Sequence, residues 1–294
     1  MAKQKTNRSA SDLRTWGLRA LAAGAALLLG GAAPALERLA VAKSKLVDPM
    51  WAEYDGRSVI TVDHDAWDAF LSSYVALGDD GVARVAYADV TPDDRAALDA
   101  YLAALQDVDP RTLNRDVQLA YWTNLYNART VALILDNYPV SSIRKIKSGL
   151  LSTGPWGREI VEVNGQGLSL NDIESGIVRP VWNEPRIHYI FNCAALGCPN
   201  LGAEAYRGAK IDAQMTAAAE AYVNNPRGVR IGADGEATLS KIYSWYLPDF
   251  GGDEAGVLAE IRKHAKGALS EALAGDIEID AYEYDWALND AATE

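Results

Sequence analysis

The sequence is poor in the residues that most often carry metal and thiol chemistry. It has two cysteines and three histidines among 294 residues. Both cysteines and one histidine fall between His188 and Cys198. Together with Glu174, these three side chains would form a four-ligand zinc site. Zinc-binding cysteines usually come in closely spaced pairs, often two pairs to a site. A single pair is a weak indication, so we predict neither a metal nor a cofactor.

Basic residues are also scarce. The chain has 28 Lys and Arg against 40 Asp and Glu, which gives a formal net charge of −12. Without residues 1–35, which hold five basic residues and one acidic residue, the charge becomes −16. Nucleic acids and anionic lipids are bound by basic patches, which so acidic a chain does not predict. We therefore expect no nucleic-acid partner, and a small molecule or a peptide as the ligand.

The N-terminus differs from the rest of the chain. Five basic residues precede residue 20, an apolar stretch covers 20–29, and small residues follow over 30–35. This order is typical of a secretory signal peptide, and an uncleaved membrane anchor is the alternative. Both place the remainder in the periplasm or outside the cell, and the anchor alternative attaches it to a membrane through this segment only. We expect a linker over 36–60 and a single globular domain over 61–294.

Hydrophobic periodicity indicates helices early in the chain and strands after residue 158. The helix expected over 115–137 is apolar nearly all round and therefore central and buried. The order lacks the helix–strand alternation of a doubly wound fold. The sequence therefore predicts an α+β fold, with helices packed on a small, largely antiparallel sheet. The expected helices cover 63–77, 91–106, 115–137, 169–174, 203–224 and 254–266, and the expected strands 82–90, 159–163, 186–192, 229–231, 237–239 and 278–286.

Five segments together resemble a known family. They read YWTNLYNA at 121–128, LSLNDIE at 168–174 with Arg179, RIHYIFNCAALGCP at 186–199, LSKIYSWY at 239–246 with Asp249 and Phe250, and YDWALN at 284–289. In this order the chain resembles the domain-of-unknown-function 547 family over about residues 60–289. The resemblance implies a domain common in exported proteins, with no reaction attached to it. It leaves open a distant likeness to papain or transglutaminase folds. Many relatives place histidine where this chain has Ser175.

The two cysteines allow three alternatives. A nucleophilic Cys193 needs a neighbouring base, but on a strand over 186–192 the base His188 would lie about 16 Å away on the opposite face. A reversal over 194–197, eased by its glycine, would bring Cys198 back toward that histidine. It would also bring the cysteines within disulfide distance, and an exported chain meets an oxidising compartment. A disulfide, a catalytic thiol and two inert buried thiols remain open.

Three polar side chains of the apolar helix are candidates for a structural or functional role. Asn124 and Asn127 lie on nearly the same face, and Arg129 has apolar neighbours as well. Buried amides need partners, because an unmet one costs about 1–3 kcal/mol. We expect the asparagines to hold neighbouring backbone, around residues 192–199. The alternative is a functional contact, with Asn127 as an oxyanion donor and Asn124 and Arg129 as ligand contacts.

Further candidates lie outside this helix. Glu174 follows Asn171 at capping-box spacing, so it is a capping residue or else a general base, a ligand or an arginine partner. A carboxylate clamp is one role for Arg179 and Arg186, and salt bridges with nearby acids are the simpler one. The remaining histidines fall at predicted helix ends, where solvated or capping side chains are expected. They are His64 and His264.

The first hypothesis for function is a binding or sensing domain. We expect its centre where helix 115–137, the helix of Glu174 and residues 188–199 meet. In this hypothesis the cysteines form a disulfide, and polar side chains line a pocket near 188–199. The serine at position 175 favours it over catalysis.

The second hypothesis is a cysteine-dependent hydrolase or acyl transferase that acts on an amide or ester. Cys193 or Cys198 would attack the carbonyl carbon, and His188 would transfer the proton. Asn127 or a backbone N–H would hold the oxyanion.

Overall fold

The structure is a computed structural model that describes residues 42–147 and 154–293. The described residues belong to one unit, Ala42–Glu294. The signal peptide or anchor expected over 1–35 lies outside the described residues. Within the described ranges, no helix is long and apolar enough to cross a membrane. The fold is α+β, as predicted.

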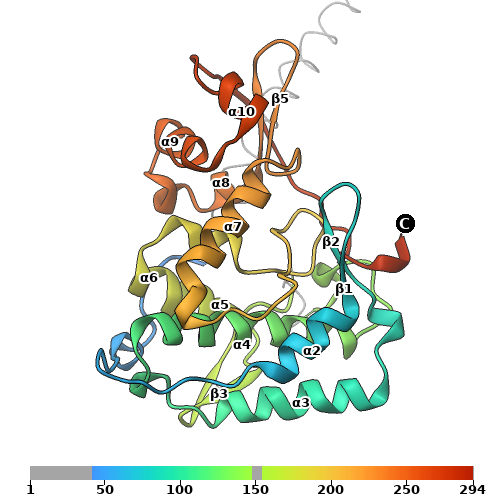
Figure 1. The fold of residues 1–294 in the computed structure, drawn as a ribbon, viewed down its shortest axis with the longest axis vertical. Helices are drawn as coiled ribbons and strands as arrows, with labels where there is room; N and C mark the ends of the chain where they lie inside the picture. Colours follow the sequence, from blue (N-terminus) through green and yellow to red (C-terminus); the bar gives the residue numbers. More distant parts are fainter. Residues whose placement is uncertain (1–41, 148–153, 294) are drawn as a thin grey trace, which may run out of the picture. The chain divides into compact units, whose positions relative to one another are not determined.

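Three helices occupy the lower half of Figure 1. They are α2 (Asp65–Tyr74), α3 (Pro92–Gln106) and α4 (Arg115–Leu135). Side-chain caps fix the starts of two of them: Thr91 accepts the Asp94 N–H at α3, and Asn114 accepts the N–H of residue 117 at α4. α4 is buried on almost every side, as its apolar sequence predicts.

Two hairpins flank the helices. β1 (Val75–Leu77) pairs with β2 (Ala83–Val85), so the strand begins where the sequence predicts the end of a helix. β3 (Val161–Val163) pairs with β4 (Gln166–Leu168). Asn164 and Gly165, with φ of 51° and 73°, form the predicted turn between them.

A π-helical turn interrupts the next helix. It is η5 (Glu174–Val178), between α5 (Leu170–Ile173) and α6 (Arg179–Trp182). The capping box at its start joins Ser169 and Asp172, so the predicted box of Asn171 and Glu174 is wrong. Ser169 reaches the N–H of Asp172 at 3.2 Å, and the Asp172 carboxylate accepts the N–H of Ser169 at 2.9 Å.

Pro180 explains a second feature of this turn. It has no N–H to donate to a carbonyl one turn back, and the carbonyls of Ser175 and Gly176 find donors outside the helix. They accept the N–H groups of Lys45 and Val47 instead, at 3.1 and 2.9 Å. We call residues 42–47 the strap.

Residues 185–189 form a 3-10 helix (Pro185–Tyr189), and the predicted strand over 186–192 is wrong. Pro185 stands at its first position, and the Glu184 carboxylate accepts the Arg186 N–H at 3.1 Å. A short apolar run is buried both as a strand and as a 3-10 helix, so hydrophobic periodicity cannot distinguish the two structures. The strand geometry used to separate His188 from Cys193 therefore does not apply.

The C-terminal half adds a three-stranded sheet. β5 (Val229–Ile231) and β6 (Ala237–Ser240) form the predicted antiparallel hairpin. β7 (Ile279–Glu283) pairs with β6 in parallel. The single sheet that the sequence predicts is thus three small sheets in the described residues, two of them antiparallel hairpins and the third mixed. A disulfide between Cys193 and Cys198 closes residues 193–198 into what we call the disulfide loop. Residues 285–290 cross to this loop and to β2, with bridges Ala195–Leu288 and Val85–Asp290.

The other helices of this half pack around that sheet. α7 (Ile211–Val223) begins eight residues later than predicted, because the Asn124 side chain pairs with the extended backbone of Tyr206. α8 (Lys241–Trp245), α9 (Glu254–His264) and α10 (Gly267–Ala272) follow. Short 3-10 helices cover Pro49–Ala52, Tyr87–Asp89, Pro110–Thr112, Ile143–Lys145, Gly208–Lys210, Leu247–Phe250 and Ala291–Thr293.

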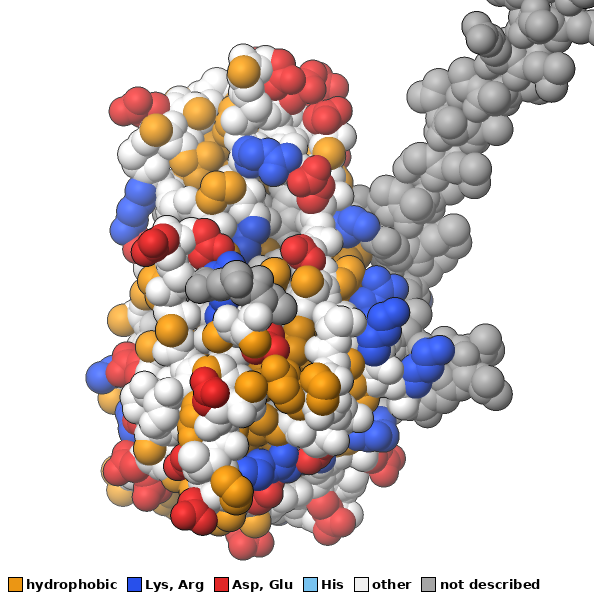
Figure 2. Space-filling model, turned by 90° about the vertical axis from the view of Figure 1, so that its right-hand side faces the viewer, with side chains coloured by type: hydrophobic (Ala, Val, Ile, Leu, Met, Phe, Trp, Pro, Cys, Tyr) orange, Lys and Arg blue, Asp and Glu red, His pale blue; other side chains and the backbone are white. Residues whose placement is uncertain are grey.

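The core has two parts. The larger surrounds α4 and includes Trp51, Trp67 and Trp122, so the expected linker contributes a fully buried side chain. The smaller lies under the C-terminal sheet, around Tyr189 and Tyr243. On the face shown in Figure 2, acidic and basic side chains are interspersed around a central group of hydrophobic ones.

Candidate functional site

A buried ionic cluster forms around Asp249, next to Tyr246 and Phe250. Its Oδ2 accepts hydrogen bonds from Arg179 Nε at 2.6 Å and from His188 Nε2 at 2.8 Å. Arg179 Nη1 also donates to Ser175 Oγ at 3.0 Å. The side chains of Arg179 and His188 are almost fully buried. The cluster thus joins the helix of Glu174, the 3-10 helix of His188 and the chain after α8.

The charges of this cluster follow from burial and pairing. Burial alone would raise the pKa of Asp249, but the hydrogen bonds from His188 and Arg179 outweigh it and lower the pKa to about 2. Burial lowers the pKa of His188, against the opposite effects of Asp249 and Glu174. At neutral pH the cluster therefore holds an ionised carboxylate, a guanidinium and a neutral imidazole.

Aromatic rings fix the orientation of His188. Tyr246 stacks on the imidazole at a centroid distance of 4.1 Å and an angle of 26°. Phe250 packs at 5.2 Å from the same ring. Arg179 lies over the Tyr246 ring at 4.7 Å. The imidazole can donate its Nε2–H to Asp249, and the rings of Tyr246 and Phe250 cover its faces.

Glu174 lies beside this cluster, at the start of the π-helical turn. Its Oε2 accepts a hydrogen bond from the buried Tyr126 hydroxyl at 3.3 Å. Burial and the Glu174 charge raise the pKa values of Tyr126 and Tyr246 well above the ordinary value. The Glu174 carboxylate thus contacts phenols from α4 and from the end of α8.

Cys193 and Cys198 form a disulfide. The S–S distance is 2.20 Å and the Cα atoms lie 6.2 Å apart. The Tyr284 hydroxyl contacts both sulfurs, at 3.1 Å from Cys193 and 3.0 Å from Cys198. Burial raises the pKa of this phenol. Of the three alternatives for the cysteines, the structure contains the disulfide, and no free cysteine occurs in the described residues.

The predicted reversal over 194–197 is present, but the residue with the unusual backbone angle is not the glycine. Ala194 takes the left-handed conformation, with φ of 60°. Gly197 is needed for space: a Cβ there would lie 2.8 Å from the Asp285 backbone nitrogen. The Gly197 N–H donates to the Asp285 carbonyl at 2.9 Å. The C-terminal segment therefore packs directly on the disulfide loop.

Asn127 and Asn124 pair with backbone. Asn127 donates to the Ile190 carbonyl at 2.9 Å and accepts the Asn192 N–H at 2.9 Å. Asn124 makes the same two bonds to Tyr206, at 2.7 and 2.9 Å. Asn127 thus holds the chain just before the disulfide loop, close to the expected place.

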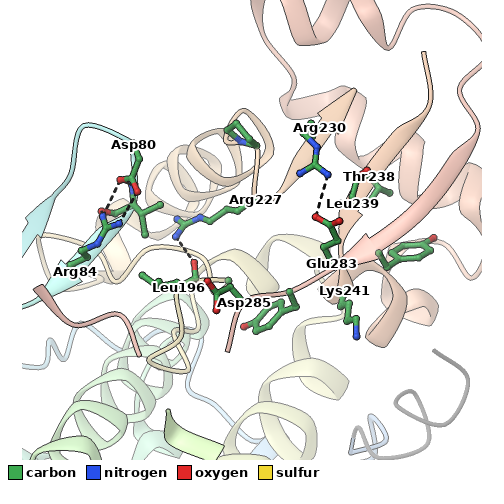
Figure 3. Close-up of a pocket in the computed structure, with 15 residues that line it drawn as sticks. Asp80, Arg84, Leu196, Arg227, Arg230, Thr238, Leu239, Lys241, Glu283 and Asp285 are labelled. Atoms are coloured by element: carbon green, nitrogen blue, oxygen red, sulfur yellow. Dashed lines mark hydrogen bonds and ion pairs between the residues drawn. The ribbon is translucent and has the colours of Figure 1, made fainter. Parts of the chain in front are cut away.

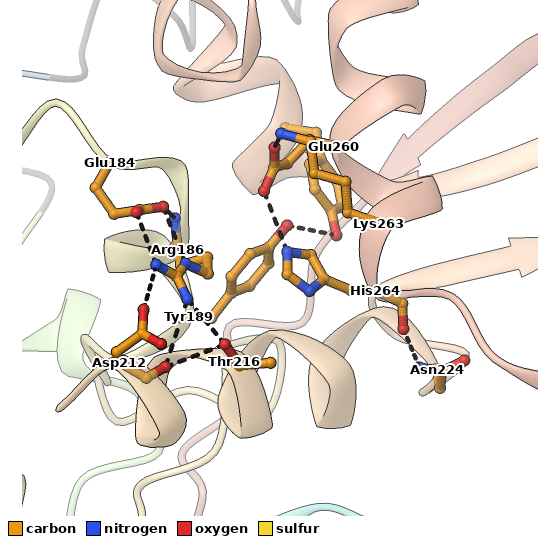
Figure 4. Close-up of polar contacts among 10 residues, drawn as sticks. Glu184, Arg186, Tyr189, Asp212, Thr216, Asn224, Glu260, Lys263 and His264 are labelled. Atoms are coloured by element: carbon orange, nitrogen blue, oxygen red, sulfur yellow. Dashed lines mark hydrogen bonds and ion pairs between the residues drawn. The ribbon is translucent and has the colours of Figure 1, made fainter. Parts of the chain in front are cut away.

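The remaining arginine candidates have different surroundings. Arg186 binds Glu184 and Asp212, each at 2.9 Å, and Thr216 at 2.8 Å (Figure 4). Its charge is therefore neutralised by local acids. Arg129 is half-buried, burial lowers its pKa, and its Nε has no partner in the described residues.

The other two histidines stand at helix ends, as expected, but both are buried and not solvated, and His64 makes no side-chain capping bond. His64 Nδ1 lies 2.7 Å from the Tyr101 hydroxyl, and burial lowers the pKa of His64 to about 4. His264 lies 3.2 Å from Glu260 (Figure 4). Within the described residues, no group of three acidic, histidine or cysteine side chains could hold a metal ion.

A cavity of about 770 Å³ adjoins the disulfide loop (Figure 3). Leu196 and Gly197 of the loop form part of its wall, together with Tyr284. The opposite walls come from the β1–β2 hairpin, the turn before β5, and the sheet. Tyr284 therefore connects the disulfide to this cavity.

Sequence reasoning missed three residues of this region. Asp249 follows the fourth resembling segment and Tyr284 opens the fifth, so the resemblance contained a signal for both. Arg227, in the wall of the cavity, belongs to no motif. Its place follows only from the contact between the turn after α7 and the disulfide loop.

Comparison with known proteins gives a family. Residues 110–223 match the model of a family described as a protein of unknown function, DUF547. Searches of the curated proteins and of the solved structures gave no significant match. The likeness to papain or transglutaminase folds thus has no support from a solved structure. The matched residues contain α4, the π-helical turn, the disulfide loop and α7, and this part of the chain belongs to the domain-of-unknown-function 547 family.

Proposed function

We propose that this chain is a non-catalytic binding or sensing domain of an exported protein. The observation that carries the proposal is the disulfide between Cys193 and Cys198, with an S–S distance of 2.20 Å. A sulfur in a disulfide is not a thiolate, so neither cysteine is a nucleophile in this state. The sequence has no third cysteine to take that role.

The cavity beside the loop supports ligand binding. Its volume of about 770 Å³ falls within the range of small-molecule sites, about 300–1,000 Å³. The disulfide restrains the loop that carries Leu196 and Gly197, and the Tyr284 hydroxyl packs on both sulfurs. In this proposal the disulfide fixes one wall of the binding site.

The alternative is a cysteine-dependent hydrolase or acyl transferase. It requires a reduced cysteine with His188 as its base. The contacts of His188 in the described residues are with Asp249, Tyr246 and Phe250, and none joins it to a sulfur. No observation therefore favours this second function.

Export is part of the proposal. It is supported by the basic and apolar order of residues 1–35. The disulfide agrees with it, because disulfides persist in oxidising compartments. A small molecule or peptide is the proposed ligand.

Thiol content separates the two functions. The chain is isolated without reductant, denatured, treated with iodoacetamide and weighed by mass spectrometry. We expect no labelled cysteine, and two labelled cysteines after treatment with dithiothreitol. A labelled thiol in the unreduced protein would contradict the binding proposal and restore the hydrolase.

Binding is tested on the cavity itself. A set of neutral small-molecule fragments is titrated into the ¹⁵N-labelled chain, and the amide signals of Leu196, Gly197 and Asp285 are followed. Thr238→Trp places a large ring in the cavity wall and should abolish any shift. Thr112→Trp adds the same bulk at an exposed position outside the cavity and should leave the shifts unchanged. Shifts that persist in Thr238→Trp would place binding elsewhere.

A further inference from the structure

Arg227 stands out among the arginines of the cavity because no carboxylate of the described residues pairs with it. It lies in the turn between α7 and β5, and Figure 3 shows it extending toward Leu196. Its Nη1 donates to the Leu196 carbonyl at 2.9 Å and its Nη2 to Asn200 Oδ1 at 2.5 Å. Both partners are neutral. Its Nε is buried with no hydrogen-bond partner in the described residues.

The two other arginines of the cavity wall are neutralised. Arg84 binds Asp80 through two hydrogen bonds, at 3.0 and 2.8 Å. Arg230 binds Glu283 at 3.2 Å. Asp80 and Arg84 both act on Arg227, but in opposite directions. The Tyr222 ring lies 5.5 Å from the Arg227 guanidinium. Arg227 therefore has an aromatic neighbour and neutral hydrogen-bond partners, but no paired carboxylate in the described residues.

Burial makes this charge costly. Burial lowers the pKa of Arg227, which means that the surroundings stabilise its cation less well than water does. A guanidinium has five N–H donors, and the two bonds to Leu196 and Asn200 leave further N–H groups unused. An anion that enters the cavity would restore the lost stabilisation through charge-assisted hydrogen bonds.

The remaining charges limit the kind of anion. Asp80, Glu283 and Asp285 also line the cavity, and the chain has a formal net charge of −12. A polyanion would be repelled, whereas a single planar carboxylate matches the fork of a guanidinium. We propose that the cavity binds a small carboxylate-bearing molecule, with its carboxylate on Arg227. This inference rests on the proposed binding function and names the class of its ligand.

Matched pairs of probes test the inference on the full, oxidised chain. Alanylalanine and its C-terminal amide differ only in the carboxylate, and so do butyrate and butyramide. We expect the two acids to shift the amide signals of Leu196, Gly197 and Asp285 with a Kd on the order of 1 mM. We expect each amide to bind at least about tenfold more weakly, since charge-assisted bonds to an ion are worth about 1.5–3 kcal/mol. The dipeptide and butyrate distinguish a peptide terminus from a free organic acid.

Two variants locate the charge. Arg227→Gln should weaken acid binding about tenfold or more, for the same reason. Arg230→Gln removes an equal charge from the same cavity wall, but from an exposed arginine already paired with Glu283. It should change the Kd by less than about threefold. If Arg227→Gln does not fold, the acid and amide pairs on the unaltered chain still show whether the cavity recognises a carboxylate.

The outcomes separate this inference from the binding function. Amides that bind as tightly as acids, or acids that bind equally well to Arg227→Gln, overturn the carboxylate site and leave a binding cavity. Inorganic phosphate that shifts the signals while both acids do not also overturns it. If neutral fragments bind in the cavity and no acid does, only the carboxylate inference fails. If neither binds, the proposed function fails with it.

Discussion

At the scale of single residues, buried polar side chains determine where irregular backbone lies. Asn127 reaches two backbone groups on either side of Phe191, and Asn124 reaches two groups of Tyr206. Each asparagine thus acts as a short piece of strand pairing for a segment that has no strand of its own. Loss of either asparagine side chain should lower the stability of the fold, because the backbone groups that it pairs with would remain buried without partners.

Asn127→Ala should lower the free energy of unfolding by about 2–5 kcal/mol, because the Ile190 carbonyl and the Asn192 N–H each lose a buried partner worth about 1–3 kcal/mol. Urea unfolding followed by circular dichroism measures the loss. Asn137→Ala, at the exposed position after α4, removes one hydrogen bond to the Leu133 carbonyl and should cost no more than about 1.5 kcal/mol. Equal losses for the two variants would contradict the role given to Asn127.

His64 makes stability depend on pH. Its pKa is about 4 in the folded chain against 6.5 for the free side chain, so between these values only the unfolded chain takes up the proton. Stability is therefore unaffected above pH 6.5 and falls as the pH drops toward 4, by about 3 kcal/mol in total at about 1.4 kcal/mol per unit. The burial that lowers the pKa of His188 acts in the same direction.

Urea unfolding at pH 7.5 and at pH 5 tests this dependence. His64→Asn keeps a side chain that can accept from the Tyr101 hydroxyl but does not titrate, so its loss of stability between the two pH values should be smaller than that of the unaltered chain. Identical losses would show that His64 does not take up a proton on unfolding.

At the scale of elements, the π-helical turn and the strap depend on each other. The turn exposes the carbonyls of Ser175 and Gly176, and the strap supplies their donors. The Ala42 carbonyl of the strap also accepts from Arg179 at 2.8 Å. Such turns are often found at functional sites, and here the turn carries Glu174 and leads into Arg179.

Gly176→Ala tests how tightly the strap packs. The added Cβ would lie 2.5 Å from Val47 Cγ1, so we expect destabilisation of about 1–3 kcal/mol from overpacking. Val47→Ala removes that methyl group, and in its background Gly176→Ala should cost much less. The four chains of this double-mutant cycle are compared by urea unfolding. A cost unchanged by Val47→Ala would mean that the strap does not restrict position 176.

At the scale of the whole molecule, the disulfide loop lies where distant parts of the chain meet. Asn127 holds its start, residues 285–288 pair with 195–197, and Arg227 binds the Leu196 carbonyl. The loop is thus tied to α4, to the C-terminal segment and to the turn before β5. The disulfide that constrains this loop should therefore contribute to the free energy of unfolding of the whole chain.

Reduction of the disulfide should lower the free energy of unfolding by about 2 kcal/mol, the chain-entropy value for so short a loop. The change is measured by urea unfolding with and without dithiothreitol. The double variant Cys193→Ser/Cys198→Ser is the control, because dithiothreitol should not affect it. An unaltered chain that is equally stable in both conditions would contradict the prediction.

The sequence by itself determined the elements whose signals are local. Thr91 and Pro92 fix the start of α3, Asn164 and Gly165 fix a hairpin turn, and the apolar sequence of α4 makes it central. The match to the family over residues 110–223 also follows from local segments, three of which lie in that range. Caps, turns and periodicity act within a few residues and need no tertiary contact.

Only the tertiary structure decided how these parts meet. A short apolar run around His188 is compatible with a strand or a 3-10 helix, and burial alone does not choose. Asp249 becomes the partner of Arg179 and His188 across 70 and 61 residues. Arg227 gains its place only because a turn packs on the disulfide loop. Such contacts depend on packing between segments far apart in sequence, which no local pattern contains.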